Sequence, residues 1–108
     1  MEMEILSTKY NYEAKYIYID NNNELDLDYY TSDDYLTLDE CEASIETHIN
    51  KLKEGKIDNV HKLLGYTIYI TSFRMALIEG EVWSNSECIK SINSIDKLNE
   101  KQLRIFNI

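Results

Sequence analysis

Two short stretches of alternating apolar and polar residues constrain the fold most strongly. Lys15–Asp20 and Glu24–Tyr29 both alternate with period two, and the turn-prone Asn21–Asn23 separates them. Period two is typical of a strand whose two faces meet different surroundings. The pattern therefore predicts an antiparallel β-hairpin over residues 14–31. Its second strand divides into an apolar face (Leu25, Leu27 and Tyr29) and a polar face (Glu24, Asp26, Asp28 and Tyr30).

An amphipathic helix is predicted next, over residues 38–53. Thr37 and Glu40 fit the S/T-x-x-E capping box, in which two side chains satisfy free backbone N–H groups at a helix start. Gly55 follows the expected end, where a left-handed residue commonly closes a helix. The apolar residues of this segment recur at helical spacing and so share one face: Cys41, Ile45, Ile49 and Leu52.

The second half of the chain carries weaker patterns. Asp58–Leu64, followed by Gly65, is typical of a short helix with a glycine stop. The β-branched and aromatic run Tyr66–Thr71 favours a strand, and Glu79-Gly80 suits the turn of a second hairpin. A single helix over residues 59–79 also fits the spacing of apolar residues. Gly65 and the β-branched run favour strands over that helix.

Two further helices are predicted towards the C-terminus. Ser84–Glu87 matches a second capping box, so a helix that buries Cys88, Ile89 and Ile92 is expected there. Residues 96–106 are also expected to be helical. The chain is therefore predicted to be a single domain over residues 1–108. Its expected class is α+β, with an N-terminal antiparallel hairpin and sheet packed against a capped amphipathic helix, further strands and C-terminal helices.

The acidic residues are unevenly distributed. The net charge is −9, and ten acids with no Lys or Arg lie between Tyr16 and Asn50. From Lys51 onward nine Lys or Arg stand against seven acids, a balance of +2. A concentrated negative charge of this kind repels nucleic acid and anionic membranes and attracts basic surfaces. We therefore expect neither direct nucleic-acid binding nor membrane binding.

The two cysteines and the N-terminus indicate a cytoplasmic protein. Cys41 and Cys88 lie far apart without CxxC neighbours, which is typical of reduced, packed thiols in an intracellular chain. The acidic start of the chain does not resemble a secretory signal, and no apolar run is long enough to span a membrane. The abundance of Ile, Asn, Tyr and Lys is typical of an AT-rich genome, so the host-cell cytoplasm is expected if the source is viral.

The sequence lacks the common catalytic and cofactor-binding patterns. Three scattered glycines build no phosphate-binding loop, and His48 and His61 belong to no HExxH motif. Asp20–Glu24 begins like a calcium loop but has Leu25 at the sixth position and Thr31 at the twelfth, where glycine and an acid are needed. The prediction is a non-enzymatic protein without cofactor or metal.

The function predicted from these patterns is that of a small acidic inhibitor, which binds and blocks a basic nucleic-acid-handling protein and acts as a monomer or small homo-oligomer. Acids at alternate strand positions lie about 6.7 Å apart, a regular spacing that can imitate nucleic-acid phosphates. Small acidic phage inhibitors of the anti-CRISPR and anti-restriction kind act through such surfaces, and this chain is similar to them in charge and size. An immunity protein or antitoxin against a basic toxin, and an accessory protein whose acidity aids solubility, are the alternatives. The predicted binding residues are Glu24, Asp26, Asp28, Tyr30, Asp33, Asp34, Asp39, Glu42 and Glu46.

Overall fold

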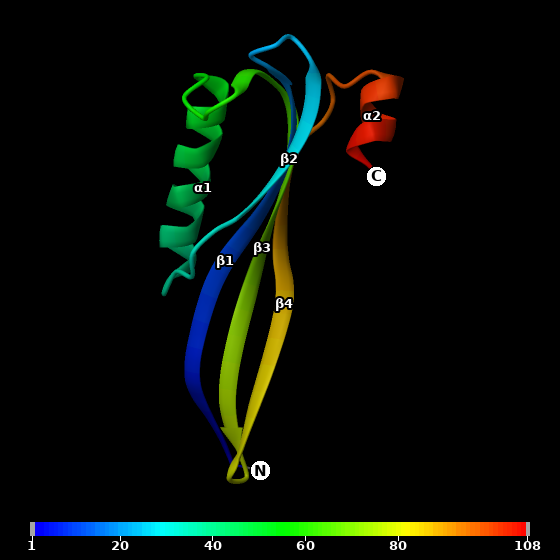
Figure 1. Cartoon of the computed structure of the whole chain (residues 1–108). Helices are drawn as coiled ribbons and strands as arrows, with labels where there is room; N and C mark the ends of the chain where they lie inside the picture. The colour runs from blue at the N-terminus through cyan, green and yellow to red at the C-terminus, as the bar shows by residue number, and fades with distance from the viewer. Residues whose placement is uncertain (1, 108) are drawn as a thin grey trace.

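A computed structural model describes residues 2–107 as a four-stranded antiparallel sheet with one helix on each face (Figure 1). The strand order is β2-β1-β3-β4, so the two longest strands lie at the centre. The elements in chain order are β1 (Met3–Asp20), β2 (Leu25–Thr31), α1 (Leu38–Lys53), β3 (Val60–Ile78), β4 (Glu81–Ser94) and α2 (Glu100–Phe106).

The predicted N-terminal hairpin is confirmed, and its first strand is longer than expected. β2 pairs with β1 over Glu13 to Ile19, while β1 begins at Met3 and continues to pair with β3. The turn depends on Asp20, whose carboxylate oxygen Oδ1 accepts the backbone N–H groups of Asn22 and Glu24, both at 2.9 Å. The resemblance to a calcium loop is therefore explained by turn chemistry.

The second hairpin turns at Glu79-Gly80, as predicted. Both residues have positive φ, 51° at Glu79 and 82° at Gly80. Two left-handed residues form the type I′ turn, whose twist matches that of the flanking strands. The β-branched and aromatic run that begins at Tyr66 is accordingly a strand, and the alternative helix over residues 59–79 is wrong.

Helix α1 has the predicted bounds and end signals. The Thr37 side chain accepts the backbone N–H of Glu40 at 3.1 Å. At the other end Gly55 has φ 69°, its N–H donates to the Leu52 carbonyl, and the next N–H donates to the Lys51 carbonyl. These two bonds form a Schellman motif, which satisfies the free carbonyls of the last turn.

The sheet has a core on each face. On the face covered by α1, the helix side chains Cys41, Ile45 and Leu52 pack against strand residues that are also buried (Tyr12, Ala14, Tyr16, Tyr18, Val60, Tyr66, Ile68 and Ile70). The face covered by α2 has a smaller core around Ile17, Leu98 and Phe106. Alternate residues of the central strands thus face different helices, which is why both helices are needed to cover the wide end of the sheet.

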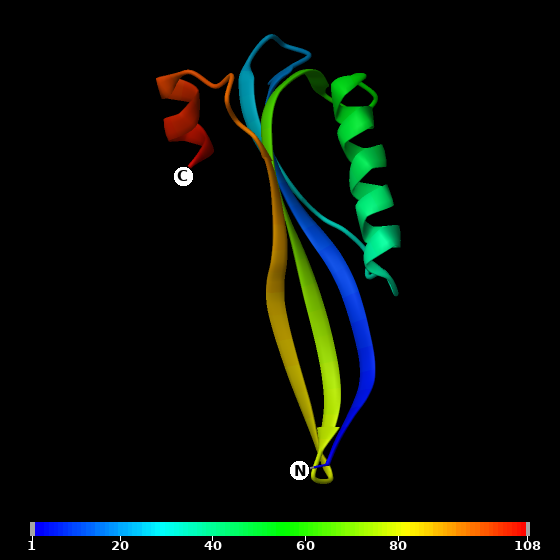
Figure 2. The same cartoon turned by 180° about the vertical axis from the view of Figure 1, so that it is seen from behind.

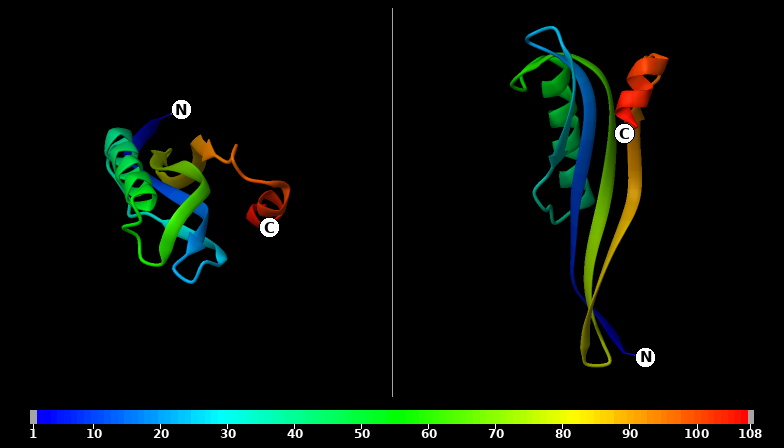
Figure 3. Two further views of the ribbon diagram at one scale, coloured as in Figure 1. Left: turned by 90° about the horizontal axis from the view of Figure 1, so that it is seen from above. Right: turned by 45° about the vertical axis from the view of Figure 1, so that its right-hand side comes forward.

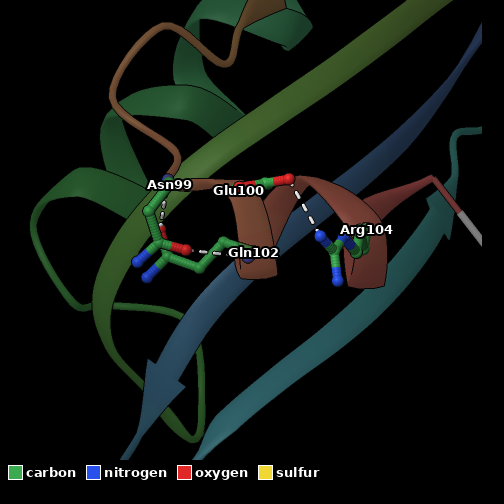
Figure 4. A network of polar contacts seen from close by, with 4 residues as sticks. All are labelled: Asn99, Glu100, Gln102 and Arg104. Atoms are coloured by element: carbon green, nitrogen blue, oxygen red, sulfur yellow. Dashed lines mark hydrogen bonds and ion pairs between the residues drawn. The ribbon is translucent and has the colours of Figure 1, made fainter.

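Helix α2 is short and stabilised at its start by a reciprocal cap (Figure 4). The Asn99 side chain accepts the backbone N–H of Gln102 at 2.9 Å, and the Gln102 side chain accepts the backbone N–H of Asn99 at 3.0 Å. Glu100 and Arg104 form an exposed ion pair one turn apart, at 2.8 Å. Neither described helix is of the length and apolarity that a membrane span requires.

The molecule is elongated, because three strands continue far beyond both helices. The Cα atoms extend over 57 × 26 × 19 Å. Figures 2 and 3 show α1 and α2 on opposite sides of the sheet at one end, and β1, β3 and β4 continuing without a covering helix at the other. We call the helix-covered part the wide end. The ribbon is called the distal arm and consists of residues 3–9 of β1, 71–78 of β3 and 81–89 of β4.

The predicted fold class, an α+β domain with C-terminal helices, is wrong. The chain is mostly antiparallel sheet, and α2 is the one helix described after α1. The helix expected over Asp58–Leu64 is the loop before β3 and the start of that strand, and the helix expected from Ser84 is strand β4. Cys88 and Ile89 are consequently exposed. The capping-box pattern is local, whereas β4 pairs with β3 from Tyr66 to Ile78, and this long-range pairing determines the structure.

Candidate functional site

Helix α1 lies over the middle of the sheet and leaves a groove along each of its sides. The groove towards β2, here called the β2 groove, has a volume of about 330 Å³ and is lined mainly by tyrosines and His48. The groove towards β4, the β4 groove, has a volume of about 550 Å³ and is lined by acids and two lysines. Both open on the same face of the wide end, so one partner could contact both.

Three of the predicted acids lie in the β4 groove. Asp39, Glu42 and Glu46 come from one side of α1, and Tyr66 and Ile92 of the sheet are among the apolar residues that line the groove with them. Lys90 of β4 forms an ion pair with Glu42 at 3.3 Å. Because both side chains of this pair are substantially exposed, it contributes little to stability. The acids are therefore available to a cation from outside.

The β2 groove is built around the imidazole of His48. Its ring lies 4.6 Å from the ring of Tyr30 and about 6 Å from those of Tyr12 and Tyr16, centre to centre. Tyr12 and Tyr16 are buried, whereas Tyr30 is 42% exposed and lies at the edge of the sheet. The groove thus combines an aromatic wall with an imidazole.

A chain of hydroxyl groups leads to this histidine. Tyr35 and Ser44 are hydrogen-bonded at 2.6 Å, the Ser44 Oγ lies 3.5 Å from the Tyr12 hydroxyl, and that hydroxyl lies 3.4 Å from His48 Nδ1. The other ring nitrogen, Nε2, is buried without a partner among the described residues. Burial, and then the charge of Lys51, lower the pKa of His48 below its ordinary value of 6.5. The neutral imidazole is therefore favoured.

Two predicted acids on β2 interact with buried tyrosines. Asp26 and Asp28 pair across the sheet with Tyr18 and Tyr16. The Tyr18 hydroxyl donates to Asp26 Oδ2 at 3.4 Å. Burial, and then the negative charge of Asp28, raise the pKa of Tyr16 to about 12. Both tyrosines stay protonated at neutral pH and can donate to these carboxylates, which orients the acids on the α1 face.

The structure divides the predicted binding residues instead of forming one continuous track. Asp26, Asp28 and Tyr30 lie on the β2 side of α1, with Asp33 and Asp34 exposed in the connection that follows β2. The acids of α1 lie on its other side. Glu24 is exposed in the turn between β1 and β2. All nine residues belong to the wide end.

Sequence reasoning missed the cluster around His48. His48 follows the buried Ile45 by three positions and Cys41 by seven, which places its ring beside the apolar face of α1. Tyr12 and Tyr16 lie four positions apart on β1, so their side chains point to the same side of the sheet. They pack there against the apolar face of α1. The helical period places His48 and the strand period places Tyr12 and Tyr16, so both positions can be read from the sequence. That these residues meet cannot be predicted without knowing that α1 packs on β1.

The residues that the structure describes contain no group of three or more His, Cys, Asp or Glu arranged to hold a metal ion. Cys41 is fully buried, and that burial raises the pKa of its thiol, so the nucleophilic thiolate is disfavoured. Comparisons with protein-family models, curated proteins and solved structures find no match to this chain. A functional proposal therefore depends on surface geometry and charge.

Proposed function

We propose that this protein binds a basic surface of a nucleic-acid-handling protein through the α1 face of its wide end. The observation that carries the proposal is that exposed acids flank α1 on both sides of one face. Asp26 and Asp28 stand on the β2 side, and Asp39, Glu42 and Glu46 on the β4 side. The proposed site of action is the cytoplasm, where such partners work.

The spacing within each acidic row supports imitation of nucleic acid. Alternate residues of a strand are about 6.7 Å apart, and residues three or four apart on a helix have Cβ atoms about 5–6 Å apart. Phosphates of one nucleic-acid strand likewise recur at a regular interval, with a rise of about 3.4 Å along the axis. Two such rows of acids on one face of the protein resemble the two phosphate backbones that border a groove of double-stranded nucleic acid.

An exposed tyrosine adds contact area beside the acids. Tyr30 is 42% exposed on the edge strand β2, and its ring lies against His48 of α1. Tyrosine is a frequent anchor in protein interfaces because it buries a large rigid surface at low entropic cost. In this proposal the carboxylates attract and orient the basic partner, and Tyr30 provides the desolvated contact.

The test compares two variants of equal net charge. Asp26→Asn with Asp28→Asn neutralises two acids in the proposed surface, and Glu2→Gln with Glu4→Gln neutralises two exposed acids in the remote N-terminal segment. The asparagines can still accept the tyrosine hydroxyls, so we expect both proteins to fold like the wild type. Each protein is used to capture binding partners from lysates of a low-GC bacterium, with and without phage infection.

Captured partners are then purified and their affinity is measured at low and moderate salt. We expect the Asp26, Asp28 variant to lose at least about tenfold in affinity, the Glu2, Glu4 variant to bind like wild type, and added salt to weaken binding. Equal binding by both variants, or retention of no basic protein by the wild type, would contradict the proposal.

A further inference from the structure

The distal arm exposes far more surface than a folded chain of this size normally does. The solvent-accessible surface is 7493 Å², whereas a compact monomer of 12.8 kDa is expected to expose about 6,300 Å². The radius of gyration is 17.3 Å, compared with about 13 Å for a compact domain of this length. The excess surface, about 1,200 Å², is comparable to what one subunit of a stable homodimer buries.

Exposed apolar residues are concentrated on the arm. Of the eleven exposed large hydrophobic residues described, seven belong to the arm: Met3, Ile5, Leu6, Phe73, Val82, Trp83 and Ile89. Several of them surround a hollow of about 370 Å³ beside Trp83. Exposed hydrophobic surface of this extent is typical of an interaction site.

Strand β4 also presents an open edge. It pairs with β3 on one side, and the strand order leaves its other side without a neighbour. The segment Glu81–Cys88 is regular, since the irregularity in the ladder comes at Ile89, and it contains no proline. Proteins usually protect such edges, because free N–H and C=O groups of the backbone can pair with another strand.

We propose that this edge pairs with β4 of a second copy of the chain, joining two distal arms in a two-fold dimer. Charge favours a second copy as the occupant. The arm contains three acids and two bases, a net charge of −1, so the rest of the chain carries −8. Two copies that meet through their arms keep their acidic wide ends apart, whereas a basic partner is attracted to the wide ends.

Symmetry restricts the register of the proposed pairing. A two-fold axis perpendicular to the sheet keeps each side chain on the same face, and opposite residues in an antiparallel pair also point to the same face. Two paired residues must therefore be an even number of positions apart in the sequence. The axis accordingly passes through a residue and not between two residues. An axis at Ser84 would place Glu81 opposite Glu87 of the partner subunit, and like charges in that position are unfavourable. An axis at Asn85 avoids this and pairs Val82 with Cys88 of the partner subunit. We therefore assign the axis to Asn85.

The assigned register can be tested with the protein's own exposed cysteine. Val82→Cys places a thiol opposite Cys88 of the partner subunit, at a Cα distance of about 4.5–5.5 Å that a disulfide can bridge. Within one chain the two positions are six residues apart on a strand, about 20 Å, so they cannot bridge. The double variant Val82→Cys, Cys88→Ser and the wild type are matched controls, because equivalent residues then lie about 20 Å apart across the axis.

After mild oxidation, we expect Val82→Cys to give a covalent dimer on non-reducing electrophoresis and both controls to remain uncrosslinked. Absence of the dimer, or equal crosslinking of the double variant, would overturn the assigned register. Light scattering at several protein concentrations tests the dimer itself. We expect a dimeric wild type and a dimeric Leu36→Glu control, since Leu36 is 73% exposed outside the arm. We expect Trp83→Glu to be monomeric but folded, because the assigned register places position 83 opposite Glu87 of the partner subunit, where like charges are unfavourable.

A wild type that stays monomeric at the highest concentration reached would overturn the dimer, and it would indicate that a different protein covers the arm. A Trp83→Glu variant that remains dimeric would also contradict it. These measurements are independent of the proposed function, because they use the purified protein and substitutions outside the acidic face of the wide end.

Discussion

His48 shows how one side chain in the β2 groove couples stability to pH. Its imidazole is surrounded by tyrosine rings, and its Nε2 is buried without a partner among the described residues. Burial lowers its pKa, so in mildly acidic solution the unfolded chain binds a proton that the folded chain does not. The contribution of His48 to the free energy of unfolding is therefore fully present at pH values well above the unfolded-state pKa of about 6.5. It declines as the pH falls below that value.

We therefore expect His48→Gln to reduce the acid sensitivity of the protein. The free energy of unfolding is measured by urea denaturation at about pH 7.5 and about pH 5. The difference between the two values should be smaller in His48→Gln than in the wild type. His61→Gln serves as the matched control for the substitution, because His61 is exposed and lies outside the β2 groove. An identical pH difference in His48→Gln and wild type would show that the imidazole titrates freely.

At the scale of elements, the sequence predicts structure where local signals and tertiary pairing agree. Helix α1 has a cap, an apolar face and a glycine stop that all indicate the same bounds, and the structure confirms them. The Asn21–Asn23 turn and the Glu79-Gly80 turn are likewise decided by residues within the turns. Their geometry was predictable because no distant residue is needed to specify it.

The errors occur where distant pairing overrides a local pattern. Ser84–Glu87 resembles a helix start, yet β3 offers it a long partner strand. The position of the candidate site depends on pairing too. Alternation alone predicts that Asp26 and Asp28 lie on the polar face of the hairpin, but it does not reveal that α1 separates them from the acids of the helix.

Gly65 illustrates the same error and provides a test of β3. It resembles a helix stop in sequence, but in the sheet it lies against β4. A Cβ atom there would come within 2.8 Å of the Ser94 carbonyl oxygen and 3.3 Å of the Leu98 side chain. We expect Gly65→Ala to lower the free energy of unfolding by about 1–3 kcal/mol, because the backbone of β4 must move.

The control for this substitution is Gly80→Asn. Gly80 has a positive φ and open space around it, and asparagine tolerates this conformation in a hairpin turn. We expect a change of less than about 0.5 kcal/mol, measured by urea denaturation. A neutral Gly65→Ala would contradict the close packing of β3 against β4 at this point.

At the scale of the whole molecule, the two ends have opposite surface character. The wide end has two helices, both hydrophobic cores and most of the negative charge, whereas the distal arm has little net charge and much exposed apolar surface. The two proposals assign one kind of partner to each end. A dimer joined through the arms would present two acidic faces at once, and a partner with repeated basic sites would then be bound with increased avidity.

The concentration of acids at the wide end should make stability depend on salt. Ion pairs among the described residues include the exposed contacts Lys56–Glu54, Lys90–Glu42 and Arg104–Glu100, each of which contributes little. These contacts compensate the repulsion among the clustered acids only weakly, and ions screen that repulsion within about 10 Å at 0.1 M salt. We expect the melting temperature to rise with NaCl at fixed protein concentration. The rise should be smaller in Asp26→Asn, Asp28→Asn, whereas a wild-type melting temperature that falls with salt would show that attractive pairs dominate.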